Sequence, residues 1–205
     1  SLGFHGESEH GLSVNINGQD PSGFYSLISG MAGEPPNNIP ISDYGHELEY
    51  IIQTDALSNM YSEAISNSFN NGQNAVSYPD TDISNQLKTV ARLISGGLES
   101  KVYMVKLSGF DTHFGQNQAE NDILGDHNDL LTKLSSAVTA FMNDLSAMNL
   151  KNDVVGLTYS EFGRKAAENG SLGTDHGEIA PMFVFGAPVK GGVSGFNPDL
   201  NEANE

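Results

Sequence analysis

The stretch VYMVKL at positions 102–107 is a short run of β-favouring residues, and it precedes the longest helical pattern in the chain. That pattern runs from about Ala119 to Met148, with apolar residues at intervals of three and four positions. Two further apolar runs, at 154–158 and 182–185, have the composition of buried strands. A strand, a helix and a second strand of one sheet form a right-handed crossover, so this order predicts a parallel sheet covered by helices.

Two more helices are expected before this core. Apolar residues at helical spacing extend from about Asp43 to Phe69, and the Asn-Asn-Gly sequence at 70–72 is a typical stop signal. A second helix is expected to begin at Ser84, which would serve as its N-cap, and to end at the glycine pair 96–97.

The first part of the chain is predicted to be mostly loop. Residues 1–42 are rich in Gly, Ser, Asn and Pro, with one alternating run at 12–16 that predicts a short strand and a turn-rich loop at 33–38. The sequence contains no internal repeat. A single α/β domain over residues 1–205, with its motif-bearing core at 100–196, is therefore the simplest prediction.

The composition excludes several classes of function. The formal net charge is −17, and residues 1–87 contain no Lys or Arg. Because such a surface repels phosphate backbones and anionic lipid, we expect no nucleic-acid partner and no membrane-surface binding. No apolar run approaches the roughly 20 residues of a membrane-spanning helix. The chain has no cysteine, which excludes disulfides and thiolate metal sites.

A first polar motif, Gly-Phe-Asp-Thr-His at 109–113, follows the strand predicted at 102–107. Side chains alternate in extended backbone, so Asp111 and His113 can point the same way. Ligands of open parallel sheets sit beyond the carboxyl ends of the strands, where a carboxylate beside an imidazole suits a metal ion. The alternative is a turn in which Asp111 caps a loop and His113 is exposed.

A second motif, Ser-Glu-Phe-Gly-Arg at 160–164, follows the strand predicted at 154–158. Glu161 could serve as a metal ligand or general base, and the Arg164 guanidinium could bind the anionic oxygens of a substrate as a bidentate donor. The alternative is that the two side chains form an ion pair with each other.

The third motif is Gly-Thr-Asp-His-Gly at 173–177. Glycines on both sides of Asp175 and His176 indicate a backbone that makes close or unusual turns around two potential ligands. The motif precedes the strand at 182–185, so it reaches the same sheet edge as the other motifs only if the connection from Phe162 to Pro181 folds back.

Two residues are candidates for a supporting role around these ligands. Thr174 lies inside the third motif. His127 falls on the apolar face of the long helix, where a histidine is usually a hydrogen-bonded core residue, yet it also lies near the helix start and so near the first motif.

Taken together and in order, these strings resemble the domain-of-unknown-function 1501 family, which comprises exported bacterial proteins of the alkaline phosphatase–sulfatase clan. The strings are FDTH at 110–113, AFMNDL at 140–145, SEFGR at 160–164, GTDHG at 173–177 and VKGG at 189–192. The resemblance implies a three-layer α/β fold with a mostly parallel central sheet, and a periplasmic or extracellular location.

The resemblance also implies that Asp111, His113, Asp175 and His176 hold one or two divalent cations, with Zn, Mn, Ca or Mg as candidates. Clan members further carry a nucleophile and an Asp ligand near the start of their fold. That early region has no counterpart in this sequence, and no nucleophile can be named. We therefore expect the N-terminal part of the family fold to be missing.

Two functions of different classes follow from these motifs. The first is a metal-dependent hydrolase of small phosphate or sulfate esters, in which Glu161 and Arg164 act beside the metal ligands. The second is a non-catalytic exported protein that keeps the fold and binds a ligand or partner. Convergence of the donor atoms on one point discriminates between them, because a metal holds its ligands at about 2.0–2.2 Å.

Overall fold

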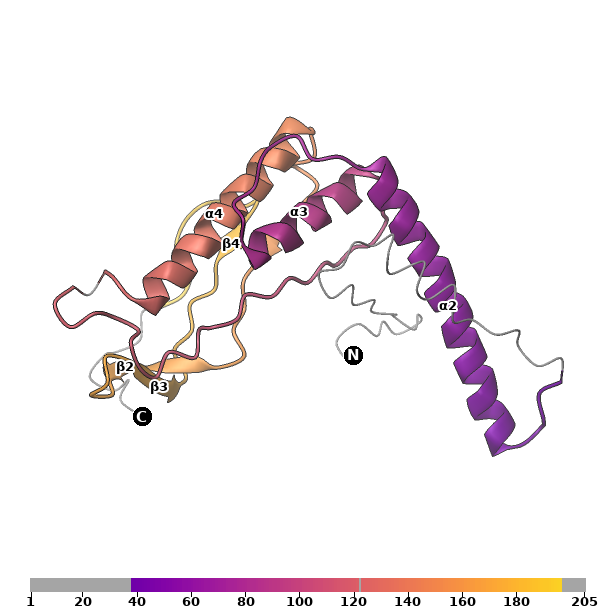
Figure 1. Ribbon diagram of the computed structural model, residues 1–205, viewed down its shortest axis with the longest axis horizontal. Coiled ribbons are helices and arrows are strands. Elements are labelled where there is room, and N and C mark those ends of the chain that lie inside the picture. The colour runs from indigo at the N-terminus through magenta and orange to yellow at the C-terminus, as the bar shows by residue number, and fades with distance from the viewer. Residues whose placement is uncertain (1–37, 122, 197–205) are drawn as a thin grey trace. The chain divides into compact units, whose positions relative to one another are not determined.

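The structure, a computed structural model, describes residues 38–121 and 123–196. The described residues form three helices and four short strands (Figure 1). They divide between two compact units. The first unit holds the chain up to Gln73 together with Thr89–Val102, and the second holds Asn74–Lys88 and the chain from Tyr103 onward. The strand predicted at 12–16 and the loop at 33–37 lie outside the described residues.

The longest helix of the first unit is α2, Asp43–Asn71. Its start is capped by Ser42, whose hydroxyl oxygen accepts a hydrogen bond from the Gly45 amide. Its end is closed by Gly72, whose amide donates to the Ser68 carbonyl. The helix predicted at 43–69 with its stop at 70–72 is confirmed. In the described part of the chain, no helix is long and apolar enough to cross a bilayer.

Helix α3, Asp82–Ser95, is confirmed, but its predicted N-cap is wrong. The side-chain oxygen of Thr81 accepts a hydrogen bond from the Ser84 amide, so Thr81 is the capping residue and Ser84 lies inside the first turn. The helix ends at the glycine pair as predicted. Gly97 has a φ of 86°, and the Leu98 amide donates to the Leu93 carbonyl, which is the closing bond of a Schellman motif.

The end of α2 is fixed within the first unit by Arg92 of α3. The Arg92 Nε donates to the carbonyl oxygens of Phe69 and Gly72, at 2.8 and 3.2 Å. The Arg92 guanidinium carbon also lies 4.0 Å from the centroid of the Phe69 ring. These contacts satisfy backbone carbonyls that the end of a helix leaves without an intrahelical partner.

Helix α4, Asp126–Ala147, is the long helix of the second unit, and it begins later than the predicted Ala119. Gly125 precedes it with a φ of 134°, a conformation that side-chain-bearing residues rarely adopt. Ile123 and Leu124 continue the apolar spacing but are exposed. The apolar pattern therefore extended the prediction past the backbone break at Gly125.

The core of the second unit lies along α4. The large buried side chains on this helix are Leu130, Phe141 and Leu145, with Ala137 and Ala140 where less space is available. Ile83 and Leu87 add buried apolar surface from the first half of α3. Asp144 is fully buried on the same helix, and its partners all come from the loop before α3.

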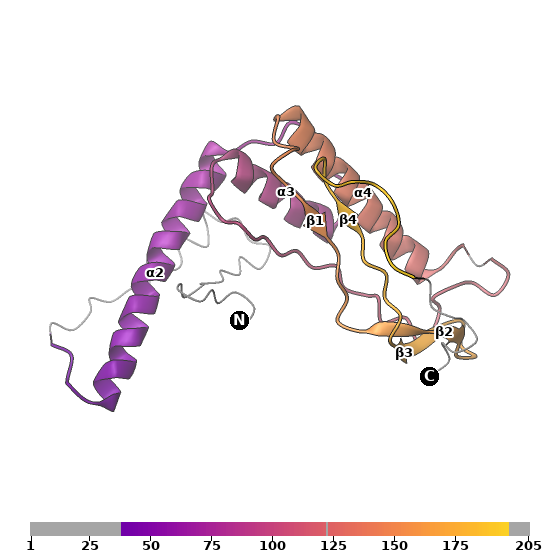
Figure 2. The same ribbon diagram turned by 180° about the vertical axis from the view of Figure 1, so that it is seen from behind.

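The predicted three-layer fold with a mostly parallel central sheet is wrong for the residues that the structure describes. These residues contain two separate two-stranded sheets, and both are antiparallel. In one, β1 (Gly156–Leu157) pairs with β4 (Val184–Phe185) (Figure 2). The apolar side chains of this pair that were expected to be buried, such as Leu157 and Val184, are exposed.

The prediction of a parallel sheet is wrong because it included the segment at 102–107 as one of the strands. Its side chains alternate between exposed and half-buried, as they would in a strand, yet it joins no strand ladder within the described residues. The predicted crossover required this segment and the strand at 154–158 to belong to one parallel sheet. The connection from β1 to β4 contains a hairpin in place of a crossover helix, and these two strands pair antiparallel.

That hairpin is formed by β2 (Gly163–Glu168) and β3 (Thr174–Gly177), and it was not predicted. Gly163 pairs with Gly177, and Arg164 pairs with His176. A Cβ atom on either glycine would lie 2.6 Å from backbone atoms of the opposite strand, so only glycine permits this approach. Through this hairpin the connection from Phe162 to Pro181 folds back, as the third motif required in order to reach the first motif.

Candidate metal centre

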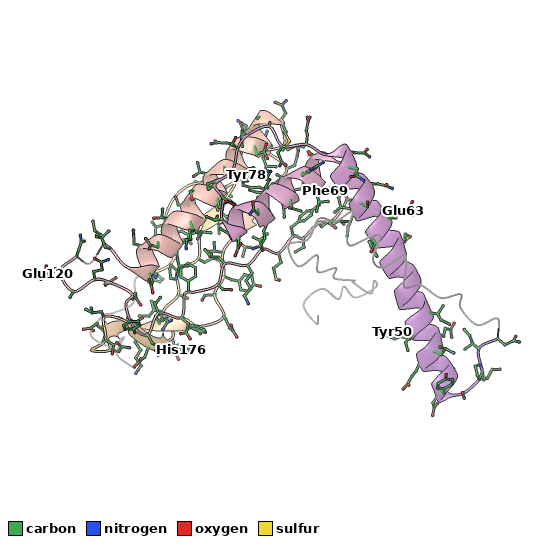
Figure 3. The ribbon with its side chains drawn as sticks, in the orientation of Figure 1. Tyr50, Glu63, Phe69, Tyr78, Glu120 and His176 are labelled. Carbon is green, nitrogen blue, oxygen red and sulfur yellow. The ribbon has the colours of Figure 1, made fainter. Side chains whose placement is uncertain are left out.

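Three side chains from two segments converge in the second unit. Asp111 and His113 belong to the segment before α4. His176, which is labelled in Figure 3, lies on β3 of the hairpin. One potential ligand atom from each residue lies within 4.8 Å of those of the other two. Convergence of the first and third motifs, on which the metal prediction depended, is therefore found in the structure.

One oxygen atom, Oδ1 of Asp111, is the centre of this cluster. It lies 2.9 Å from His176 Nε2 and 3.1 Å from His113 Nε2. Arg164 Nη2 donates to the same oxygen at 2.8 Å. The hydrogen bond from His176, supported by the charges of His113 and Arg164, lowers the pKa of Asp111 below its usual value.

The other ring nitrogen of His113 faces a second carboxylate. His113 Nδ1 lies 3.1 Å from Asp175 Oδ1. The Asn169 side-chain amide donates to this oxygen, also at 3.1 Å. Hydrogen bonding by Asn169, and then by His113, lowers the pKa of Asp175. Asp175 therefore lies beside the cluster, bound to one of its members, and is not among the three converging residues.

The His176 ring is held by stacking. The Phe162 ring lies parallel to it at a centroid distance of 3.9 Å and an interplanar angle of 16°. The His113 ring lies 4.9 Å away on tilted planes. Stacking restricts rotation of the imidazole, so Nε2 of His176 stays directed at Asp111.

Arg164 joins the two halves of the site. Its Nη1 donates to the Thr174 carbonyl on β3, and its Nη2 donates to the Phe110 carbonyl, both at 2.6 Å. Its side chain is 19% exposed. With the ion pair to Asp111, these bonds tie the loop carrying the first motif to the hairpin carrying the third. The alternative pairing of Arg164 with Glu161 is not among the ion pairs of the described residues.

Gln116 provides a second link between the same two segments. Its side-chain oxygen accepts hydrogen bonds from the hydroxyls of Thr112 and Thr174, both at 2.9 Å. The Thr174 amide also donates to the Thr112 carbonyl. Thr174 therefore joins the hairpin to the loop of the first motif, and its predicted supporting role around the ligands remains a prediction.

A close backbone approach sets the distance between loop and hairpin. A Cβ atom on Gly173 would lie 2.3 Å from the carbonyl carbon of His113 and 2.6 Å from the Phe114 amide nitrogen. Only a glycine lets the hairpin come this near to the first motif. The flanking glycines of the third motif had predicted close or unusual backbone turns, and Gly173 permits a close approach to another segment.

The cluster fits a single divalent cation. Two atoms bound to one Zn²⁺ at about 2.1 Å and at a tetrahedral angle lie about 3.4 Å apart. The two imidazole nitrogens lie 2.9 and 3.1 Å from the Asp111 oxygen, so small outward shifts would accommodate an ion. Two imidazoles and one carboxylate also form a donor set that transition metals favour.

Two further predicted site residues lie outside the cluster of Asp111, His113 and His176. Glu161 is exposed on the turn before β2 and is not one of the three converging residues. His127, in the first turns of α4, packs edge-on against Phe110 at a centroid distance of 5.9 Å. His127 thus contacts the first motif at Phe110, and its supporting role remains a prediction.

Three residues of the site were missed by the sequence interpretation: Phe162, Gln116 and Asn169. The Asn-Gly dipeptide at 169–170 was an available signal, because this pair between two extended runs is typical of a hairpin turn. Gln116 carried no such signal, since its role depends on two threonines distant from each other in sequence.

The family whose members are described as "Protein of unknown function (DUF1501)" matches residues 53–204 of the chain. The chain belongs to this family. The match confirms the family resemblance and includes all three motifs of the DUF1501 chain. No curated protein and no solved structure matches it.

Proposed function

We propose that Asp111, His113 and His176 of the DUF1501 chain bind one divalent cation, and that this cation serves the hydrolysis of a small phosphate or sulfate ester. The observation that supports the proposal is the convergence of a carboxylate and two imidazoles within 4.8 Å of one another. The proposal also includes an exported location, as the resemblance implied.

The donor set favours some of the candidate metals over others. Ca²⁺ and Mg²⁺ prefer shells of oxygen atoms, whereas imidazole nitrogens suit transition metals. Two of the three ligands are imidazoles, so Zn²⁺ is the first proposed ion. Mn²⁺, which oxygen ligands suit better, is the second. When bound, such a cation supplies Lewis-acid polarisation of an ester oxygen.

The side chains of the chain have distinct tasks in this proposal. Arg164 keeps Asp111 ionised and directed toward the two imidazoles, through the 2.8 Å contact. Arg164 and its neighbour Lys165 on β2 supply positive charge beside the cluster, which an anionic ester needs in a protein of net charge −17. Glu161, exposed on the preceding turn, is the proposed general base.

A second function, a non-catalytic ligand-binding protein, is favoured by a different observation. The hydroxyls of Thr112 and Thr174, which are the ones next to the cluster in sequence, both donate to Gln116. Both terminal nitrogens of Arg164 are likewise engaged by backbone carbonyls. In this case the cation would hold the loop and the hairpin together without taking part in a reaction.

The metal proposal is tested by titrating the purified, metal-stripped protein with Zn²⁺ and with Mn²⁺ in a calorimeter. We expect one site per chain in the wild type and none in His176→Ala. His46→Ala is the matched control, because His46 is an exposed histidine on α2 in the first unit and should leave binding unchanged. Wild-type protein that binds neither ion would contradict the proposal.

The two functions are separated by turnover. Metal-loaded protein is assayed with p-nitrophenyl phosphate and p-nitrophenyl sulfate, beside the Glu161→Gln variant. Hydrolysis that is lost in Glu161→Gln while Zn²⁺ affinity is kept supports the hydrolase. Tight metal binding with no turnover of either ester, in a protein that elutes and unfolds normally, supports the binding function.

A further inference from the structure

We infer that Asp175 is the positioning carboxylate of the metal centre and not one of its ligands. This inference rests on the proposed cation site, and it differs from the ligand role that the sequence motif implied for Asp175. Its basis is the contact between Asp175 Oδ1 and His113 Nδ1, together with the position of His113 Nε2 against Asp111.

The first step is the geometry of the imidazole ring. Nδ1 and Nε2 direct their bonding orbitals away from each other, so a partner of one nitrogen lies on the far side of the ring from a partner of the other. Nε2 of His113 faces Asp111 at 3.1 Å, while Nδ1 faces Asp175 at 3.1 Å. Asp175 Oδ1 therefore lies behind His113, where it contacts the ring rather than the cluster.

The second step is a count of protons. A neutral imidazole carries one N–H and one lone pair. An Nδ1–H donating to Asp175 leaves the lone pair on Nε2, where it faces the Asp111 carboxylate. A lone pair and a carboxylate repel each other unless a cation lies between them. Asp175 thus selects the tautomer that presents Nε2 as a ligand.

The third step is the fixation of Asp175 itself. The Asn169 amide group donates to Asp175 Oδ1 at 3.1 Å and to the His113 carbonyl at 2.8 Å. The Asn169 side-chain oxygen accepts from the Ser171 amide, which locks the side chain into the hairpin turn. One amide group of Asn169 therefore fixes both the Asp175 carboxylate and the backbone of His113.

Metal affinity and the metal's own spectrum test the inference together. We expect Asp175→Ala to weaken Zn²⁺ binding about 10–100-fold, the usual effect of removing an outer partner of a histidine ligand. The ligand shell measured by X-ray absorption should keep two imidazoles and the same number of oxygen atoms. Asp111→Ala, by contrast, should change that shell. Asp153→Ala, which removes another exposed carboxylate of the same unit, should change neither quantity.

A loss of one oxygen ligand in the Asp175→Ala spectrum would overturn the inference, as would an unchanged Zn²⁺ affinity. A second readout needs no metal and so separates this inference from the proposed function. In metal-free Asp111→Ala protein with a neutral His113, no carboxylate faces Nε2, so the ¹⁵N shifts of His113 should show the Nδ1–H tautomer. Adding Asp175→Ala should move these shifts toward Nε2–H. An Nε2–H tautomer in the Asp111→Ala protein contradicts the positioning role.

Discussion

Asp111 and Asp144 are both carboxylates of the second unit, and each is contacted by three nitrogen or oxygen donors, but the donors differ in kind. Those of Asp144 are neutral: the Asn74 side-chain amide, the Ala75 backbone amide and the Tyr78 hydroxyl, at 2.6–2.8 Å. Those of Asp111 are a guanidinium and two imidazoles. Asp144 is fully buried, whereas the Asp111 side chain is 56% exposed.

The difference separates a structural carboxylate from a binding one. The groups that contact Asp144 act as hydrogen-bond donors, so exchanging them for a cation would leave partly buried polar groups without this acceptor. Two of the partners of Asp111 can change from donor to ligand by losing a proton, and the site is open to solvent. A metal ion can therefore replace hydrogen bonds at Asp111, but not at Asp144.

The largest effect on stability is expected for Asp144→Ala. Removing this carboxylate leaves an amide, a backbone N–H and a phenol without their partner and opens a cavity in the core. We expect the free energy of unfolding to fall by about 3–5 kcal/mol. Urea denaturation followed by circular dichroism measures it, with Asp153→Ala as the exposed control. A loss below about 1 kcal/mol would show that the network is not structural.

The converse result is expected for Asp111→Ala. It should lower Zn²⁺ affinity beyond the about 10–100-fold loss typical of an outer partner, because it removes a ligand. The unfolding midpoint in metal-free protein should stay near that of the wild type, since the side chain is exposed. Calorimetric titration and a thermal melt of the same sample measure both. If the Asp111→Ala variant melts far below the wild type and still binds Zn²⁺, Asp111 is a structural carboxylate and not a binding one.

Tyr78→Phe weakens the Asp144 network at one donor (Figure 3 labels Tyr78). We expect a loss of about 1 kcal/mol in the free energy of unfolding at pH 7. Burial, and then the hydrogen bond to Asp144, raise the pKa of Tyr78. The neutral phenol therefore stabilises the native state below its ordinary pKa of about 10, and this contribution is lost as the pH rises toward the raised pKa.

The pH dependence is the control for that prediction. Wild type and Tyr78→Phe are unfolded in urea at several pH values between 7 and 11. The stability difference should be constant up to about pH 9 and should shrink above about pH 10, because only the wild type loses the phenol contribution. A difference that grows with pH would mean that the tyrosinate is the favoured form.

Local signals account for the parts of the fold that were predicted correctly. The end of α3 depends on Gly97, whose φ of 86° favours a residue without a side chain, and the end of α2 coincides with the Asn-Asn-Gly stop signal at 70–72. The start of α4 was wrong because Ile123 and Leu124 fit the apolar spacing, while the φ of Gly125 is not encoded in that spacing. The pairing of β1 with β4 joins residues far apart in sequence, so it could not be derived from the strand-like runs alone. The hairpin of β2 and β3 is local, and the Asn-Gly signal at its turn was missed.

The site shows the same division between residue chemistry and tertiary contact. Asp111, His113 and His176 were predicted because carboxylates and imidazoles suit metals and because their motifs resemble those of the family. Which nitrogen of His113 faces which carboxylate depends on the hairpin, so Asp175 was assigned as a ligand although it lies behind the ring. An ordinary residue such as Gln116 gains its role only when two distant threonines meet it.

Of the variants considered, Gln116→Leu should have the smallest effect, and it tests whether metal binding at Asp111 depends on the contact between loop and hairpin. Gln116→Leu keeps the volume but removes the oxygen that accepts from Thr112 and Thr174. If Asp111 belongs to a binding site that needs loop and hairpin in register, Zn²⁺ affinity should fall about tenfold, while the unfolding free energy falls by about 1 kcal/mol. The double variant Thr112→Val with Thr174→Val removes the donors in place of the acceptor and should reproduce the affinity loss. Equal Zn²⁺ affinity in the wild type and both variants would mean that the cluster is held by Arg164 alone, because its bonds to Phe110, Asp111 and Thr174 join the same segments.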